Sequence, residues 1–180
     1  MTGVQTCALP IFEWGVAYAR AAGLERAVVT AQPRPVSPYN WMVVVRNGEE
    51  VRYSFVNLTR RAPRRLGPDA SFIERLGAPY LPLSQARWVY ASHFVSGSDR
   101  AVAREAWRQE PFRFFRWFAA YPVLYRIDAG NPSTCVWFQD LRFFTPGRGR
   151  WPFRFGMCRE QGGPWEPYQL IDDQKRIPVQ

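Results

Sequence analysis

Lysine, histidine and long apolar runs are almost or wholly absent from this chain of 180 residues. His93 is the only histidine. A hydrolytic zinc site normally uses two or three histidines with a carboxylate, so the sequence predicts no complete site of that kind. No run reaches the roughly 18 consecutive apolar residues of a transmembrane helix, and none is predicted. The H-E-x-x-H, G-x-S-x-G, Walker and G-x-G-x-x-G patterns are missing too, which removes the best-marked catalytic and phosphate-binding motifs.

Cysteine is scarce, and its spacing argues against a metal site. Cys135 and Cys158 lie far apart, and no second C-x-x-C pair accompanies them. They could lie on neighbouring strands and touch. We expect them instead to be small apolar core residues in a reducing compartment.

The chain begins with the eleven residues MTGVQTCALPI. They resemble the in-frame translation of a sequencing adapter, V-T-G-V-Q-T-C-A-L-P-I, with a GTG start codon read as Met. We therefore expect residues 1–11 to be a non-native peptide. On this interpretation Cys7 does not count, the native sequence begins mid-gene near Phe12, and preceding sequence is lost.

The net charge of +9 is supplied almost entirely by arginine, because Lys175 is the only lysine. A basic chain favours anionic partners such as acidic lipid headgroups or nucleic acid. Arginine without lysine is also what a GC-rich genome produces. As the explanation of the arginine excess, we prefer codon bias together with a solvated or membrane-facing basic surface over nucleic-acid binding. The one local cluster comprises Arg60, Arg61, Arg64 and Arg65.

The first half of the chain predicts one helix and a hairpin. Trp14, Ala17, Tyr18 and Ala21 recur at helical spacing within 12–24, which ends near Gly23. A proline-rich loop over 32–41 separates a strand at 26–30 from strands at 41–46 and 49–56. Asn47-Gly48 predicts a type I′ turn between the last two. Residues 58–82 are predicted as a surface excursion with a short helix at 70–76, and 83–90 as a further short helix.

The second half predicts helices followed by an antiparallel meander. Ser98 is a candidate cap for a helix over 99–109, and Pro111 begins a second helix. In that second helix Phe112, Phe115 and Phe118 form an apolar stripe. Strands are predicted at 122–128, 134–144 and 151–159. The fold class is therefore α+β: an antiparallel sheet, meander plus N-G hairpin, with a few helices on one face, in a single domain over 25–172 and a polar tail at 173–180.

Two pairs of residues are the candidate functional positions. On a strand, Asp140 and Arg142 point the same way, so they can form an ion pair at a sheet edge or jointly hold a polar ligand. Asn40 and Trp41 close the proline-rich loop, where packing is a stronger expectation than binding. Asp172-Asp173 and the turn P-G-R-G-R read as solvated segments rather than ligand sites.

The order of these motifs is similar to that of a known family. A P-x-P-x-x-P-x-N-W loop, an N-G hairpin, an F-R-W-F helix, D-L-R-F and W-x-F-x-F follow one another over residues 12–155. This resembles the C-terminal soluble region of the YdjM-like, metal-dependent hydrolases of the bacterial inner membrane. The resemblance is carried by Asn40, Trp41, Phe118, Asp140, Leu141, Arg142 and Phe143.

The resemblance implies a truncated, inactive domain of a membrane-bound hydrolase. The divalent metal, of unknown identity, and its His and Asp ligands would belong to the missing N-terminal helices of the parent, so no metal ligand or catalytic residue is expected here. The helix at 12–24 would be a remnant of, or flank to, the last membrane helix. The domain would be cytoplasmic. The alternative is a non-enzymatic basic module that binds anionic lipid headgroups or a protein.

Overall fold

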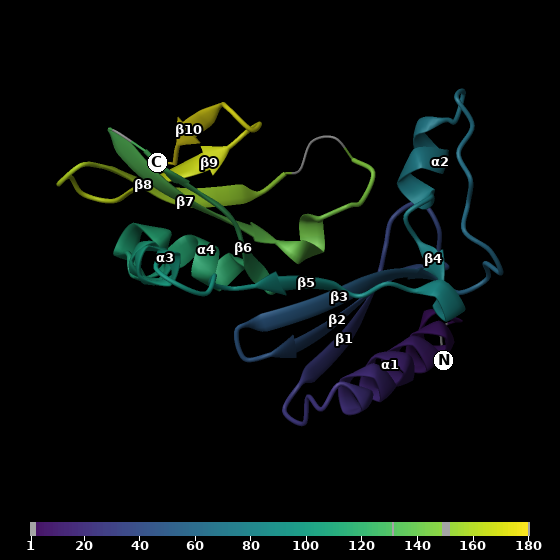
Figure 1. The fold of residues 1–180 in the computed structure, drawn as a ribbon. Coiled ribbons are helices and arrows are strands. Elements are labelled where there is room, and N and C mark those ends of the chain that lie inside the picture. The colour runs from purple at the N-terminus through teal and green to yellow at the C-terminus, as the bar shows by residue number, and fades with distance from the viewer. Residues whose placement is uncertain (1–2, 131, 149–151, 180) are drawn as a thin grey trace. The chain divides into compact units, whose positions relative to one another are not determined.

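The computed structural model describes residues 3–130, 132–148 and 152–179, with the backbone alone for residues 3–8. The chain has an α+β fold, as predicted, but its strands form two five-stranded sheets rather than one. It divides into two compact units, Met1–Ala91 with Pro146–Arg148, and Ser92–Thr145 with Gly149–Gln180. The sequence predicted a single domain over 25–172. Each unit has its own sheet and helices (Figure 1).

The first unit is built on a sheet ordered β1-β2-β3-β4, to which β5 adds by pairing with β3. Neighbouring strands β1, β2 and β3 are antiparallel, whereas β4 runs parallel to β3. The elements are α1 Gly3–Ala21, β1 Val28–Pro33, β2 Asn40–Asn47, β3 Glu50–Asn57, α2 Phe72–Gly77, β4 Leu81–Pro82, the 3-10 turn η1 Leu83–Gln85 and β5 Val89–Ser92. The helix predicted over 83–90 is therefore a single 3-10 turn followed by a strand.

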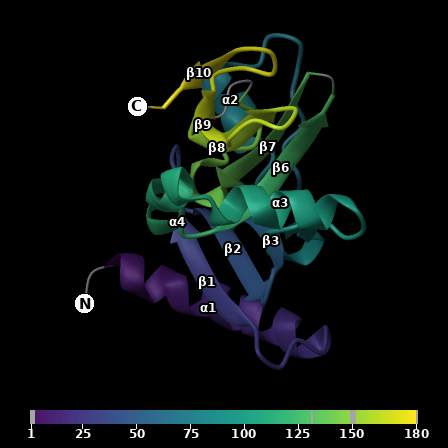
Figure 2. The ribbon, with the colours of Figure 1, turned by 90° about the vertical axis from the view of Figure 1, so that its left-hand side faces the viewer.

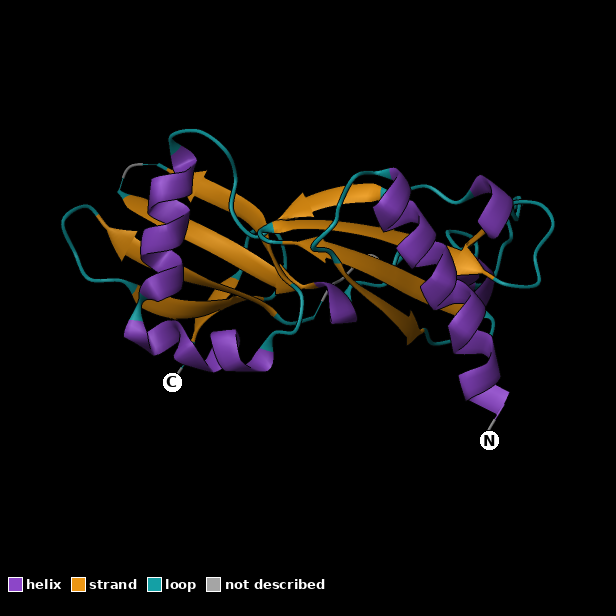
Figure 3. Cartoon of the chain, turned by 90° about the horizontal axis from the view of Figure 1, so that it is seen from below, coloured by secondary structure: helices purple, strands orange, loops and turns teal. Residues whose placement is uncertain are grey.

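Helix α1 covers one face of this sheet (Figure 3). It begins at Gly3, well before the predicted start at residue 12, and the chain leaves it through Gly23 at a φ of 67°. Ile11, which we had set aside with the non-native peptide, is fully buried against the sheet. Ala17 and Ala21 are exposed, contrary to the predicted stripe. The buried face is instead centred on Gly15, where a β-carbon would meet Val side chains of both β1 and β2.

The hairpin between β2 and β3 is present, but its turn is shifted by one residue. Asn47 pairs with Glu50, so Gly48 and Glu49 occupy the two central positions. Among the described residues of this turn only Gly48 has a positive φ, 62°. Positive φ at the first central position alone is the pattern of a type II′ turn, which glycine favours there, rather than the predicted type I′.

The second unit is a five-stranded antiparallel meander in the order β10-β9-β8-β7-β6. The predicted three-stranded meander is thus confirmed and longer. Its elements are α3 Asp99–Arg108, η2 Glu110–Phe112, α4 Arg113–Phe118, β6 Pro122–Ala129, β7 Ser133–Asp140, η3 Leu141–Phe143, β8 Arg154–Glu160, β9 Glu166–Leu170 and β10 Arg176–Pro178. β10 lies in the segment predicted as a polar tail, and β7 ends at Asp140 rather than at residue 144. β8 begins after Phe153, and Trp151 lies outside the described residues.

Helices α3 and α4 pack on one face of this meander (Figure 2). The predicted stripe of Phe112, Phe115 and Phe118 is confirmed: the first two are fully buried and the third packs against the same core. Met157 of β8 is buried there too. Ser98 precedes α3 as predicted but does not cap it, because its backbone is helical and its hydroxyl makes no capping hydrogen bond.

Candidate functional site

The predicted pair of Asp140 and Arg142 forms, with the carboxylate buried and the guanidinium half-buried. Asp140 is 2% exposed. Its carboxylate accepts hydrogen bonds from the backbone N–H of Ala120 at 2.9 Å and of Tyr121 at 3.3 Å. It also accepts from the Arg142 backbone N–H at 3.0 Å and from Arg142 Nε at 2.7 Å. Every oxygen of the carboxylate is therefore used within the protein.

Arg142 reaches this carboxylate by a route that strand alternation did not predict. β7 ends at Asp140, whose side chain caps the 3-10 turn η3 that contains Arg142. The guanidinium also donates to the carbonyl of Phe118 and lies 5.1 Å from the ring centres of Phe118 and Phe143. The pair therefore joins the end of α4 to the end of β7. The ion pair that the sequence left open as one alternative is therefore present, and the binding of a polar ligand stays a prediction.

Asn40 and Trp41 also have structural partners. The Asn40 side chain accepts a hydrogen bond from Asn57 Nδ2 at 2.6 Å, and its backbone N–H donates to Ser37. The indole N–H of Trp41 donates to the Pro38 carbonyl at 3.1 Å, while the ring lies in the core beneath α1. The proline-rich loop is thereby closed onto β2 and β3. Its candidate residues therefore hold the loop.

Asn57 continues this network into the segment that follows β3. Its side-chain oxygen accepts hydrogen bonds from the backbone N–H groups of Thr59 and Arg60. The Arg60 guanidinium then donates to the carbonyls of Gly77 at 2.8 Å and Tyr80 at 2.7 Å. One arginine thus joins the two ends of the excursion over residues 58–77. Burial, with the neighbouring charge of Arg64, lowers the pKa of Arg60.

Helix α2 orders the far part of the excursion. Ser71 and Glu74 form a reciprocal capping box, with the Ser71 hydroxyl accepting from the Glu74 N–H and the Glu74 carboxylate accepting from the Ser71 N–H. Arg64 forms an ion pair with the same carboxylate at 2.7 Å. The hydrogen bonds from Ser71, and the charge of Arg64, hold the pKa of Glu74 below its ordinary value.

The excursion exposes apolar and basic side chains together. Phe72 and Ile73, on α2, are 66% and 62% exposed, and Leu66 is 46% exposed. Residues 58–77 hold five arginines and two carboxylates, a net charge of +3. In Figure 1 the segment forms a long loop and helix beyond the end of β3. We call it the 61–75 surface and define it by the exposed residues Arg61, Arg65, Leu66, Phe72, Ile73 and Arg75.

Sequence reasoning found only half of this surface. It identified the arginine cluster and a short helix, but it did not place Phe72 and Ile73 outside the core. The available signal was the S-x-x-E capping box that starts at Ser71, because it fixes where α2 begins and how short it is. A two-turn helix flanked by prolines and glycines has too little length to bury all of its apolar residues.

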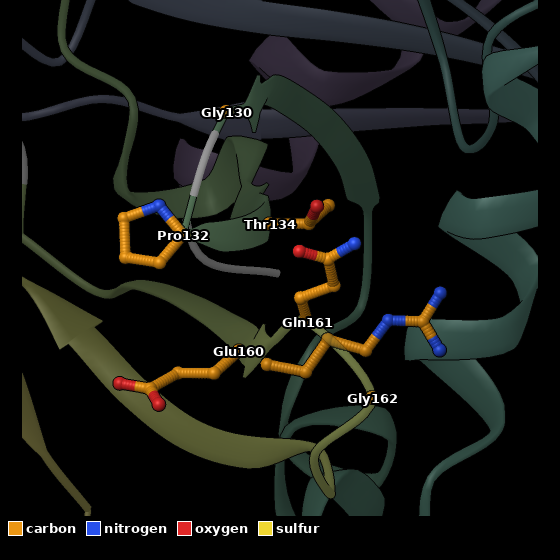
Figure 4. A pocket seen from close by; sticks show the side chains of 7 residues that line it. Gly130, Pro132, Thr134, Glu160, Gln161 and Gly162 are labelled. Carbon is orange, nitrogen blue, oxygen red and sulfur yellow. The ribbon is translucent and has the colours of Figure 1, made fainter.

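A cavity of about 430 Å³ lies between the turns β6–β7 and β8–β9. Figure 4 shows the Gln161 amide extending toward Thr134, while the Glu160 carboxylate points to the opposite side. Arg159 also lines the cavity, but it is paired with Glu105 at 2.5 Å. In the lining that the structure describes, no nucleophile lies beside a base.

His93 lies among aromatic rings: it is stacked on Phe94, and its ring centre lies 4.2 Å from that of Trp107 in a T-shaped contact. Across the described residues no three His, Cys, Asp or Glu side chains gather in a way that could hold a metal ion. None of the helices in the described part of the chain combines the length and hydrophobicity needed to cross a bilayer.

Asp172 and Asp173 are ordered by the turn between β9 and β10. Asp172 accepts hydrogen bonds from the backbone N–H groups of Gln174 and Lys175. Asp173 accepts from the Tyr125 hydroxyl at 2.9 Å and from Arg154 at 3.0 Å. These two contacts lower the pKa of Asp173. Both residues therefore make contacts within the meander, while the Asp173 side chain stays 71% exposed, in keeping with the expected solvated segment.

The two cysteines of the meander form a disulfide, contrary to the expectation of reduced core residues. Cys135 of β7 pairs directly with Cys158 of β8 in the antiparallel register. Disulfides persist mainly in oxidising compartments. The sequence had left open that the two residues touch on neighbouring strands, and only the register decides it.

Comparison with protein-family models, curated proteins and solved structures finds no match to this chain. The candidate residues of the sequence, Asn40, Trp41, Asp140 and Arg142, have structural contacts, and the 61–75 surface presents chemistry that the fold does not use.

Proposed function

We propose that this chain is a non-enzymatic module that binds anionic lipid headgroups at the bacterial inner membrane through the 61–75 surface. The observation that carries the proposal is the exposure of Leu66, Phe72 and Ile73 within a segment of net charge +3. Basic residues beside exposed apolar ones bind at the interface of anionic bilayers, because the charges attract headgroups and the apolar groups enter the acyl boundary. The chain's overall charge of +9 adds long-range attraction.

The magnitudes support weak binding that needs both kinds of residue. Each arginine near an anionic surface contributes about 1 kcal/mol, so Arg61, Arg65 and Arg75 together supply about 3 kcal/mol. Fully burying a Phe or Ile side chain is worth about 1.5–3 kcal/mol. Phe72 and Ile73 are about two-thirds exposed and together supply a further ~3 kcal/mol. Association costs at least about 4 kcal/mol, so losing either half leaves little net affinity.

Vesicle co-sedimentation of the full chain tests the proposal. We expect binding to vesicles of phosphatidylcholine with phosphatidylglycerol, weaker binding at high salt, and little binding to phosphatidylcholine alone. Replacing Arg61 and Arg65 with Gln should reduce binding about 30-fold. The control replaces Arg46 and Arg108, two exposed arginines outside the surface, with Gln. Equal losses in both double variants would show unspecific charge attraction and refute the assignment to this surface.

The same proposal includes the side of the inner membrane on which the chain lies. The disulfide between Cys135 and Cys158 favours the oxidising side of the inner membrane over the cytoplasmic side that the sequence suggested. Thiol labelling in intact cells tests this: a disulfide that is present without added oxidant supports the oxidising side, and two thiols that react only after lysis contradict it.

A hydrolase parent is a second proposal, and it rests on the YdjM-like resemblance. Asn40, Trp41 and Asp140, which carry that resemblance, are buried, and residues that hold a fold can be shared without a shared active site. The divalent metal would be held by other parts of the parent. The metal content of a full-length YdjM-like protein should not change when the residue matching Asp140 is replaced, and loss of the metal would place a ligand in this domain.

A further inference from the structure

The cystine of the second unit lies beside a cation. Cys135 and Cys158 are 3% and 4% exposed on the face of the meander that also carries Trp137 and Leu170. The guanidinium of Arg176, on the edge strand β10, donates hydrogen bonds to both sulfurs, at 3.1 Å to Cys158 Sγ. A disulfide that serves only to join two strands needs no cation, because its sulfurs carry no charge.

Arg176 is held in this position by its surroundings. β10 pairs with β9, which sets Arg176 opposite Leu170. The guanidinium lies 5.0 Å from the ring centre of Tyr168, whose hydroxyl donates to Glu166 at 3.0 Å. That hydrogen bond to a carboxylate raises the pKa of Tyr168, so the phenol stays neutral. The guanidinium thus contacts both the Tyr168 ring and the two sulfurs.

A cavity lies beside one cysteine of the pair. Cys158 and Arg176 both line a hollow of about 310 Å³. The other ionisable groups of its lining are Arg159, Glu160, Glu166 and Tyr168. The hollow is therefore polar, and its volume exceeds that of a cysteine side chain. Cys158 belongs to its described lining and Cys135 does not, so we assign the attack to the sulfur of Cys158.

We propose that Cys135–Cys158 is a thiol–disulfide exchange site whose partner is a protein or small-molecule dithiol. A thiolate of the dithiol attacks Cys158 Sγ, the bond between Cys158 and Cys135 breaks, and Cys135 leaves as a thiolate. The second thiol of the partner then displaces Cys158 from the mixed disulfide. The partner is oxidised to its disulfide, and the two cysteines are reduced, so two electrons and two protons are transferred in all.

Arg176 supplies the chemistry that makes this exchange favourable. A guanidinium beside a sulfur stabilises the thiolate that leaves, and exchange is faster when the leaving thiol is more acidic. The same interaction stabilises the reduced pair and makes the disulfide easier to reduce. The site does not depend on membrane binding, because every residue that it uses lies in the meander and outside the 61–75 surface.

The test follows reduction of the full chain by dithiothreitol, with thiols trapped by a maleimide reagent that shifts gel mobility. Cys7 is replaced by Ser in every protein, so that only two cysteines report. We expect complete reduction of the folded protein at pH 8. Arg176→Gln should slow it about fivefold and require more dithiol at equilibrium, while Arg176→Lys should recover most of the rate. Lys175→Gln, which removes a neighbouring charge, should change neither.

Three outcomes would overturn the proposal. Resistance to dithiol until the protein unfolds would show a purely structural disulfide. Equal rates for wild type, Arg176→Gln and Lys175→Gln would show that the cation has no role. The third outcome is that Arg176→Gln alters reduction only because the meander of this variant is unfolded, which circular dichroism of each variant would reveal. In the reduced protein, thiolate formation should shift to higher pH in Arg176→Gln but not in Lys175→Gln.

Discussion

Replacing Asp140 tests most sharply whether this residue holds the fold, because its carboxylate accepts hydrogen bonds from several buried donors at once. Removal of the side chain leaves the backbone N–H groups of Ala120 and Tyr121 without their acceptor, and Arg142 without its counter-charge. Hydrogen bonds to a charged group contribute about 1.5–3 kcal/mol, and unpairing a buried ion pair costs about 3–5 kcal/mol. Arg142 is 32% exposed and can be partly hydrated, so we expect Asp140→Ala to cost about 3 kcal/mol in all.

Urea unfolding at neutral pH measures this cost. Asp140→Asn keeps one acceptor oxygen and should cost about half as much as Asp140→Ala. Asp69→Ala removes an exposed carboxylate and should change the free energy of unfolding by less than about 0.5 kcal/mol. If Asp140→Ala were as stable as Asp69→Ala, the carboxylate would not be holding α4 to β7, and a ligand-binding role would have to be reconsidered.

Three further expectations follow from other contacts. Gly15→Ala should destabilise the protein by about 1 kcal/mol in thermal melts, because crowding against Val29 and Val43 at 2.7 and 2.8 Å outweighs the gain in helix propensity. Gly67→Ala should not destabilise it, because the added methyl meets nothing within 4 Å. Replacing Cys135 and Cys158 together with Ala should lower the free energy of unfolding by about 3 kcal/mol, because the bridge closes a loop of 23 residues; an unchanged urea midpoint would contradict this. The folded-state pKa of Glu74 is depressed, so its stabilisation of α2 is complete above the ordinary carboxyl pKa and is lost as the pH falls through the depressed value. An NMR titration of Glu74 should show the depressed pKa, and Arg64→Gln should raise it.

Local patterns predicted the elements that carry their own signals. The segment 151–159 was predicted as a strand and contains β8, the stripe of Phe112, Phe115 and Phe118 predicted a helix where η2 and α4 lie, and Asn47-Gly48 predicted a hairpin. The turn type was missed because the register differs from the expected one by a single residue. Strands β9 and β10 were missed because they are short and each contains a proline, and because β9 gains its structure from pairing with β8 and β10 from pairing with β9.

Features that depend on register or on long-range contacts could not be read from the sequence. The disulfide requires Cys135 to pair with Cys158, which only the alignment of β7 and β8 determines. The Asp140–Arg142 pair was predicted from a strand that continues past Arg142, whereas β7 ends at Asp140 and Arg142 lies in the following 3-10 turn. Exposure of Phe72 and Ile73 depends on how short α2 is, and apolar residues in a sequence are more often buried than not.

The depth of residue 73 in a bilayer tests the membrane proposal most directly. Ile73→Cys, in a chain with Cys7 replaced by Ser, would carry a nitroxide label on α2, and Ala101→Cys on the exposed side of α3 provides the control. With vesicles that contain phosphatidylglycerol, the label at residue 73 should lose access to a water-soluble relaxant and gain access to oxygen, while the label at residue 101 should not. Unchanged access at residue 73 while the protein is bound to the vesicles would contradict insertion of the 61–75 surface.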